Sequence, residues 1–167
     1  MKVPSICLII FLVFNQTAYG HKRTYRKKIR IHTYIEQYVT ATEKEYGLPK
    51  SLLSAVIAQE SSYHTRAVNY STNIPSYGLG QITLPTAKSF CKIKTKSELF
   101  QHDKNIHCTA KILKHHIVEY GSIHSALAAY RAGTPCKRKY SRKHRICTKD
   151  DEQYISSVVR KKAAMSL

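Results

Sequence analysis

The chain has 167 residues, which suits one domain with a hydrophobic core of its own. Its 28 Lys and Arg residues outnumber its 10 Asp and Glu residues, and the formal net charge is +18. This charge favours acidic partners such as nucleic acids, anionic cell-wall polymers or phospholipid head groups. We find no internal repeat and no inter-domain linker, which excludes a repeat array.

Residues 1–20 have the pattern of a secretory signal peptide. Lys2 supplies a positive start, residues 6–14 are an apolar run, and residues 18–20 form a cleavage site of the Ala-x-Ala kind. The apolar run is far shorter than the roughly 20 residues of a membrane-spanning helix. We therefore expect export to the periplasm or cell wall, which argues against a specific nucleic-acid partner.

A basic segment at residues 21–30 precedes the one expected domain, residues 31–162. Apolar residues at helical spacing predict its first helix from Ile31 to Tyr46, and Gly47 ends it. Pro49 then suits the first turn of a second helix.

Glu60 lies at the end of that second helix, which carries residues 52–60. It is the only acid from residue 47 to residue 96, and it shares a helix face with Val56 and Ile57. A carboxyl group on an apolar face is costly to ionise. Glu60 therefore either has a partner or has a pKa raised for proton transfer.

The rest of the chain is predicted as further short helices joined by turns. Residues 71–75 are rich in turn formers, and residues 76–84 form a loop or a short hairpin. Gly121 ends one helix and Ser122 caps the next. The predicted helices cover residues 85–90, 106–117, 123–130 and 154–159. The fold class is therefore mostly α, one domain of short helices with at most a small β-hairpin.

The cysteines fit export, because four remain once Cys7 leaves with the signal peptide. Four cysteines allow three pairings. We favour Cys91–Cys108 with Cys136–Cys147, because both pairs close short local loops.

A metal site is not predicted. The chain has no Cys-x-x-Cys and no paired His spacing of the zinc type. The neighbours His115 and His116 follow a helical pattern, so we expect their side chains to diverge. A second basic cluster, residues 136–149, is either a solvated loop or a contact for an anionic wall polymer or membrane surface.

Four short motifs occur in one order along the chain: Glu60-Ser61, Ser76-Tyr77-Gly78-Leu79-Gly80-Gln81, Asn105-Ile106 and Ala128-Ala129-Tyr130-Arg131-Ala132-Gly133. This set resembles the lytic transglycosylases with a goose-lysozyme-like (SLT) domain. In that family the four corresponding motifs are, in the same order, Glu-Ser, Gly-Leu-Met-Gln, Asn-Ile and Ala-Ala-Tyr-Asn-Ala-Gly. The resemblance covers about residues 31–160. Within that family, the chain looks most like the small enzymes that accompany type IV secretion, conjugation or pilus machines.

The resemblance implies a lysozyme-like fold and cleavage of the β-1,4 bond between N-acetylmuramic acid and N-acetylglucosamine in peptidoglycan. The muramic 6-hydroxyl would attack the anomeric carbon, giving a 1,6-anhydro product. Glu60 would first donate a proton to the leaving oxygen and then accept one from that hydroxyl. Such an enzyme needs no cofactor and no metal, and we expect a monomer.

Tyr130 is expected to hydrogen-bond to Glu60 and orient its carboxyl group. By the same resemblance, further residues are expected to contact substrate: Ser61, Tyr77, Gly78, Leu79 and Gln81. Three positions depart from the family pattern. Gly80 stands where Met is usual, Arg131 where Asn is usual, and Thr109-Ala110 where Gly is common.

No second acid lies near Glu60 in the sequence, whereas ordinary glycosidases use two carboxylates. The remote acids are expected to cap helices or lie at the surface: Glu98, Asp103, Glu119 and residues 150–152. This favours a mechanism with one carboxyl group. Two alternatives stay open, a goose-type lysozyme that hydrolyses the same bond and a secreted wall-binding protein without activity.

Overall fold

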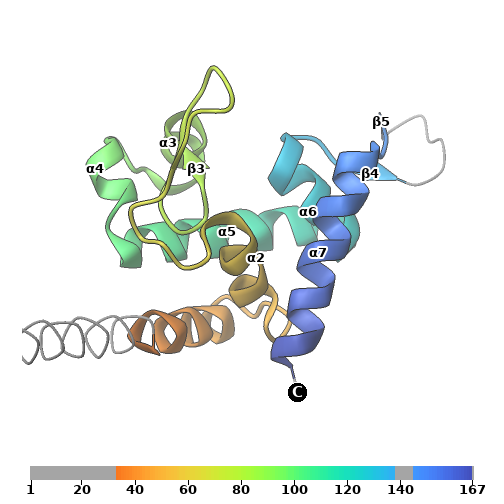
Figure 1. Cartoon of the computed structure of the whole chain (residues 1–167), viewed down its shortest axis with the longest axis horizontal. Coiled ribbons are helices and arrows are strands. Elements are labelled where there is room, and N and C mark those ends of the chain that lie inside the picture. The colour runs from red at the N-terminus through yellow and green to blue at the C-terminus, as the bar shows by residue number, and fades with distance from the viewer. Residues whose placement is uncertain (1–32, 138–144, 167) are drawn as a thin grey trace, which may run out of the picture. The chain divides into compact units, whose positions relative to one another are not determined.

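The computed structural model of the chain describes residues 33–137 and 145–166 (Figure 1). The predicted signal peptide, residues 1–20, and the basic segment, residues 21–30, lie outside these ranges. Within them, no helix combines the length and the apolar character needed to cross a membrane.

The fold is mostly helical, as predicted. Residues 33–45 are helical, and six labelled helices follow: α2 (Leu52–Ser61), α3 (Leu84–Cys91), α4 (Lys96–Leu99), α5 (His102–Tyr120), α6 (Ile123–Ala132) and α7 (Lys149–Met165). The long helix α5 contacts α2, α3, α4 and α6. Figure 1 shows α3 and α4 towards one end of α5, with α6 and α7 towards its other end.

Local end signals explain where these helices begin and end. Gly121 ends α5 with positive φ, and the Ser122 hydroxyl accepts the Ser125 N–H at the start of α6, both as predicted. The helix α4 was not predicted. It begins with a capping box between Thr95 and Glu98. The helix has only four residues, which are too few to show a helical spacing of apolar residues.

The strands are more numerous than the sequence suggested. Three two-residue strands form an antiparallel sheet in the order β1 (Val68–Asn69), β2 (Ser76–Tyr77) and β3 (Ile82–Thr83). A hairpin was predicted at most, and the added strand β1 comes from residues that carry no strand pattern. A parallel pair, β4 (Cys136–Lys137) and β5 (Arg145–Ile146), flanks residues 138–144.

The helix α2 is held at both ends. The buried Glu43 carboxylate accepts the backbone N–H groups of Ser51 at 2.5 Å and Leu53 at 2.8 Å, and so caps the N-terminus of α2. Near its C-terminus, Gln59 accepts hydrogen bonds from Ser157 and Lys161 of α7. These contacts fix the position of the helix that carries Glu60.

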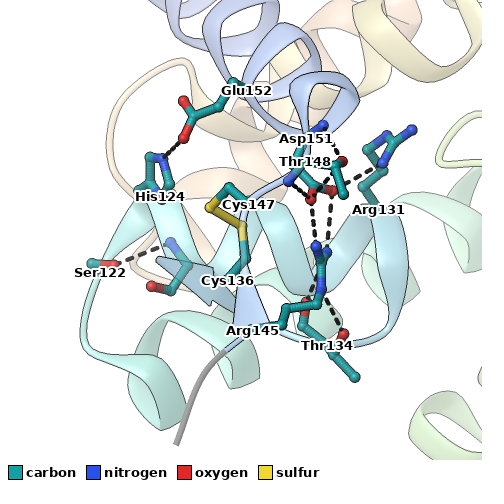
Figure 2. Close-up of a disulfide and its surroundings, with 11 residues drawn as sticks. Ser122, His124, Arg131, Thr134, Cys136, Arg145, Cys147, Thr148, Asp151 and Glu152 are labelled. Carbon is teal, nitrogen blue, oxygen red and sulfur yellow. Dashed lines mark hydrogen bonds and ion pairs between the residues drawn. A yellow bond between two sulfur atoms is a disulfide. The ribbon is translucent and has the colours of Figure 1, made fainter. Parts of the chain in front are cut away.

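Both favoured disulfides are confirmed. Cys91 of α3 is bonded to Cys108 of α5, and Cys136 of β4 is bonded to Cys147 just before α7. The second bond holds β4 next to the start of α7 (Figure 2).

Candidate active site

A cleft of about 930 Å³ separates the sheet and α3 from α6 and α7. Glu60 lines this cleft from α2, together with Tyr130 and Arg131 of α6 and Tyr154 of α7. On the opposite side the lining comes from the sheet, α3 and the C-terminal half of α5. Glu60 is the only acid among the described residues that line the cleft.

The Glu60 carboxyl group is set up to hold a proton near neutral pH. Burial raises its pKa to about 7, while a hydrogen bond from Tyr154 and the positive charge of Arg131 act in the opposite direction. The Tyr154 hydroxyl donates to Glu60 Oε1 at 2.5 Å. No other hydrogen bond reaches this carboxyl group within the described ranges, so Oε2 is available to a substrate.

The predicted hydrogen bond between Tyr130 and Glu60 is wrong. The Tyr130 hydroxyl donates instead to the Gly80 carbonyl oxygen at 2.6 Å. Tyr130 still lines the same cleft as Glu60, and burial, followed by the charge of Glu60, raises the pKa of Tyr130. The hydrogen-bond partner, Tyr154, was missed because it lies 94 residues away in the sequence and follows an ordinary helical pattern.

Four of the expected substrate contacts do not line the cleft, and three of these four are consecutive, residues 77–79. Leu79 is fully buried, and Tyr77 packs edge-on against Phe100. Gly78 has φ +73°, and a Cβ atom there would lie 2.3 Å from the Leu99 carbonyl oxygen. We expected Gly78 to let the glycan approach, but the close neighbour is the protein itself.

The Asn105 side chain holds the loop of residues 77–80 in place by hydrogen bonds. Its side chain is 1% exposed, accepts the Gly80 N–H at 2.7 Å and donates to the Tyr77 and Leu99 carbonyl oxygens at 3.0 and 2.8 Å. All polar atoms of the amide are therefore used inside the protein, and the residue is structural.

Gln81 lines the cleft, whereas Ser61 does not. The Gln81 amide is already bound to the protein, because its Nε2 donates to the Gly78 carbonyl at 2.8 Å and its Oε1 accepts from Ser76 at 3.0 Å. Ser61 is buried and its hydroxyl donates back to the Ile57 carbonyl of its own helix at 3.2 Å. Substrate contact by Gln81 stays a prediction.

Comparison with known proteins shows the family of the chain. The transglycosylase SLT domain family matches residues 37–153. The chain belongs to this family. Its members are peptidoglycan lytic transglycosylases.

Relatives of the chain support the same assignment. Protein IpgF of Shigella flexneri is 34% identical over 102 residues, which cover 59% of this chain and 67% of that protein. A transglycosylase of Enterobacteria phage PRD1 is 29% identical over 58% of this chain and 34% of its own length. An inactive variant of the lytic transglycosylase Slt from Pseudomonas aeruginosa has the same fold, with TM-score 0.68 and 22% identity over 78% of this chain. The chain spans about a quarter of that Slt chain, at 24%.

Gly80, where the sequence departs from the expected Met, packs closely against Thr109 and Tyr130. A Cβ atom at Gly80 would lie 1.9 Å from Thr109 Oγ1 and 2.9 Å from the Tyr130 hydroxyl. The Thr109 side chain therefore fills the space that a residue larger than Gly at position 80 would need. Gly80 is therefore required by the packing of this chain.

Arg131, the third departure from the SLT pattern, is held by a buried carboxylate (Figure 2). Asp151 is 0% exposed and accepts hydrogen bonds from Arg131 at 2.9 Å, from Arg145, and from the Thr148 hydroxyl and N–H at 2.9 and 2.8 Å. The hydrogen bond from Arg145, followed by those from Thr148, holds the pKa of Asp151 well below its usual range, although burial acts in the opposite direction. Asp151 thereby joins α6, β5 and the start of α7, one turn before Tyr154.

One group of potential metal ligands occurs in the part of the chain that the structure describes. Ligand atoms of His124, Cys147 and Glu152 lie within 4.8 Å of one another. The Cys147 sulfur is bonded to Cys136 and so offers no thiolate, and His124 Nε2 faces Glu152 at 3.3 Å (Figure 2). None of these three residues lines the cleft.

Proposed function

We propose that this SLT-family enzyme cleaves the β-1,4 bond between N-acetylmuramic acid and N-acetylglucosamine with formation of a 1,6-anhydro product. The observation that carries the proposal is Glu60, a partly buried carboxyl group with its pKa raised to about 7, in a cleft whose described lining holds no second acid. A general acid is most effective when its pKa lies near the working pH.

The contacts of Glu60 fit both halves of this reaction. Protonated Glu60 keeps Oε1 as acceptor of the Tyr154 hydroxyl, so the proton is on Oε2 and is donated to the leaving oxygen. The resulting carboxylate is stabilised by the same hydrogen bond and by the charge of Arg131. It then accepts the proton of the muramic 6-hydroxyl as that oxygen bonds to the anomeric carbon, which restores the neutral acid.

The products of purified peptidoglycan test this reaction by mass spectrometry. We expect muropeptides with the mass of the anhydro form, and their loss in Glu60→Gln. Hydrolysed products would instead establish a lysozyme, and a protein that binds but releases nothing would establish a wall-binding role.

The proposed setting is the bacterial envelope, where the substrate lies. Residues 1–20 would direct export, and the glycan strand would be the main partner during local wall remodelling. Association with a secretion, conjugation or pilus apparatus is part of the same proposal, and co-purification of the native protein with envelope complexes tests it.

A further inference from the structure

Side chains of the kinds that bind metal ions gather outside the cleft, beside the disulfide that joins β4 to the start of α7 (Figure 2). Ligand atoms of His124 on α6, Cys147 and Glu152 on α7 lie within 4.8 Å of one another. The sulfur of Cys136 is bonded to that of Cys147, so it belongs to the same group. Sequence spacing did not predict this group, because packing of α6 against α7 brings its members together.

The ring nitrogen Nε2 of His124 is enclosed without a hydrogen bond. It makes none within the described ranges, although Glu152 Oε1 lies only 3.3 Å away. Buried polar atoms in proteins normally have a hydrogen-bond partner. A cation held between the imidazole and the carboxylate satisfies both of them.

The separation of His124 and Glu152 suits two ligands of one zinc ion. Bonds of about 2.0–2.2 Å at a tetrahedral angle place a nitrogen and an oxygen ligand roughly 3.3–3.5 Å apart, and the observed distance is 3.3 Å. A thiolate ligand belongs about 3.6 Å from each of these atoms. The Cys147 sulfur lies at most 4.8 Å from them, so a movement of about 1.2 Å or less brings it into place.

The disulfide decides whether the sulfurs can bind a metal, because only a thiolate is a ligand. A dithiol reductant gives two electrons and two protons to the bond between Cys136 and Cys147, and is itself oxidised to a disulfide. Cys147 is partly exposed and Cys136 is fully buried, so the reductant attacks at Cys147. Zinc then displaces one proton from each of the two thiols.

We propose that the dithiol form of this protein binds one zinc ion through four side chains, those of His124, Cys136, Cys147 and Glu152. Two thiolates, an imidazole and a carboxylate are all established zinc ligands. Four protein ligands leave no open position, so the site is structural and takes no part in catalysis.

The zinc ion takes over the structural task of the disulfide. It joins β4 to the start of α7 as the disulfide does, and it adds a direct link to α6 through His124. Tyr154 follows two residues after Glu152 on α7 and donates its hydroxyl to Glu60. The ion therefore keeps this helix in place in a chain whose disulfide has not yet formed or has been reduced.

Titration of the reduced protein with Co²⁺, a spectroscopic substitute for zinc, tests the site. A phosphine reductant opens the disulfides, and Cys7→Ser keeps an additional thiol out of the measurement. We expect one Co²⁺ per chain, with thiolate-to-metal absorption and the visible bands of tetrahedral Co²⁺, all displaced by Zn²⁺. The oxidised protein is expected to show neither signal.

Substitutions identify the ligands. His124→Ala and Glu152→Gln are each expected to weaken zinc binding by more than about tenfold, because even the loss of a residue that only orients a ligand costs this much. His107→Ala is the matched control, since His107 also faces a carboxylate, Glu45 at 3.9 Å, but lies outside this group. Its zinc affinity is expected to equal that of the unsubstituted protein.

Urea unfolding gives a second readout that does not depend on colour. Zn²⁺ is expected to raise the unfolding midpoint of the reduced protein and to leave that of the reduced Cys136→Ser/Cys147→Ser protein unchanged. Circular dichroism of each variant in its oxidised form shows whether the substitution has disturbed the fold. If the reduced protein is unfolded without metal, Zn²⁺ is expected to restore its helical signal.

Four results would each overturn the site. These are a reduced protein without thiolate-to-metal absorption, an unchanged zinc affinity in His124→Ala, the same metal binding by the oxidised protein, and absorption that persists in Cys136→Ser/Cys147→Ser. The last result would place the metal at the thiols of Cys91 and Cys108.

Discussion

Glu60→Gln is expected to stabilise the protein while abolishing its activity. In the unfolded chain Glu60 has its ordinary pKa of 4.5, and in the folded protein burial raises this to about 7. Between these values the folded state keeps a proton that the unfolded state has released. The free energy of unfolding of the wild type therefore falls as pH rises from about 4.5 to 7, and this contribution is constant above 7.

The size of the effect follows from the two pKa values. One pKa unit corresponds to about 1.4 kcal/mol, so the shift from 4.5 to about 7 gives roughly 3 kcal/mol above pH 7. Glutamine cannot ionise and its carbonyl oxygen can still accept the Tyr154 hydrogen bond. The variant therefore avoids this loss of stability.

Urea unfolding with intact disulfides at pH 4, 5.5, 7 and 8.5 measures the difference between the two proteins. We expect the variant to match the wild type at pH 4 and to exceed it by roughly 3 kcal/mol at pH 8.5. Glu119→Gln, on the exposed part of α5, controls for removal of a negative charge. A difference that stays flat across this pH range would refute the raised pKa and with it the role of Glu60 as a proton donor.

Tyr154→Phe removes a hydrogen bond that lowers the Glu60 pKa, so pH–rate profiles should show activity reduced about tenfold to a hundredfold and its alkaline limb moved to higher pH. Gly80→Ala should lower the free energy of unfolding by about 1–3 kcal/mol, because the added Cβ meets Thr109 Oγ1, and adding Thr109→Ala should recover part of this loss in urea unfolding. Asp151→Asn leaves the guanidinium groups of Arg131 and Arg145 without their shared carboxylate and should lower the free energy of unfolding by about 2–3 kcal/mol at pH 7. This is less than for a fully buried ion pair, because both arginines are partly exposed.

Each of these outcomes has a control or a result that contradicts it. An unmoved alkaline limb in Tyr154→Phe would show that its hydroxyl does not set the Glu60 pKa. Additive losses for Gly80→Ala and Thr109→Ala would show that the two positions do not compensate each other. Asp150→Asn is the matched control for Asp151, because Asp150 is exposed and 3.6 Å from Arg131, and it should cost less than 1 kcal/mol.

The sequence by itself determined the helical class and the disulfides, and it pointed to the candidate acid. Apolar spacing, Gly121 and Ser122 are local signals, and local signals fix where helices begin and end. Glu60 was identifiable because an isolated carboxyl group on an apolar helix face is costly wherever the helix packs. The disulfide pairing could be predicted because the cysteines of each pair are close in the sequence, and closing a short loop costs little conformational entropy.

Only the tertiary structure decided which side chains meet Glu60 and why the departures are tolerated. The hydrogen bond from Tyr154 joins α2 and α7, and the contact of Gly80 with Thr109 joins a loop and α5. Such pairs depend on how helices pack, and side-chain type alone does not specify packing partners that are tens of residues apart. For the same reason Tyr130, which the motif pointed to, donates to a backbone carbonyl, and the isolated acid is oriented by another tyrosine.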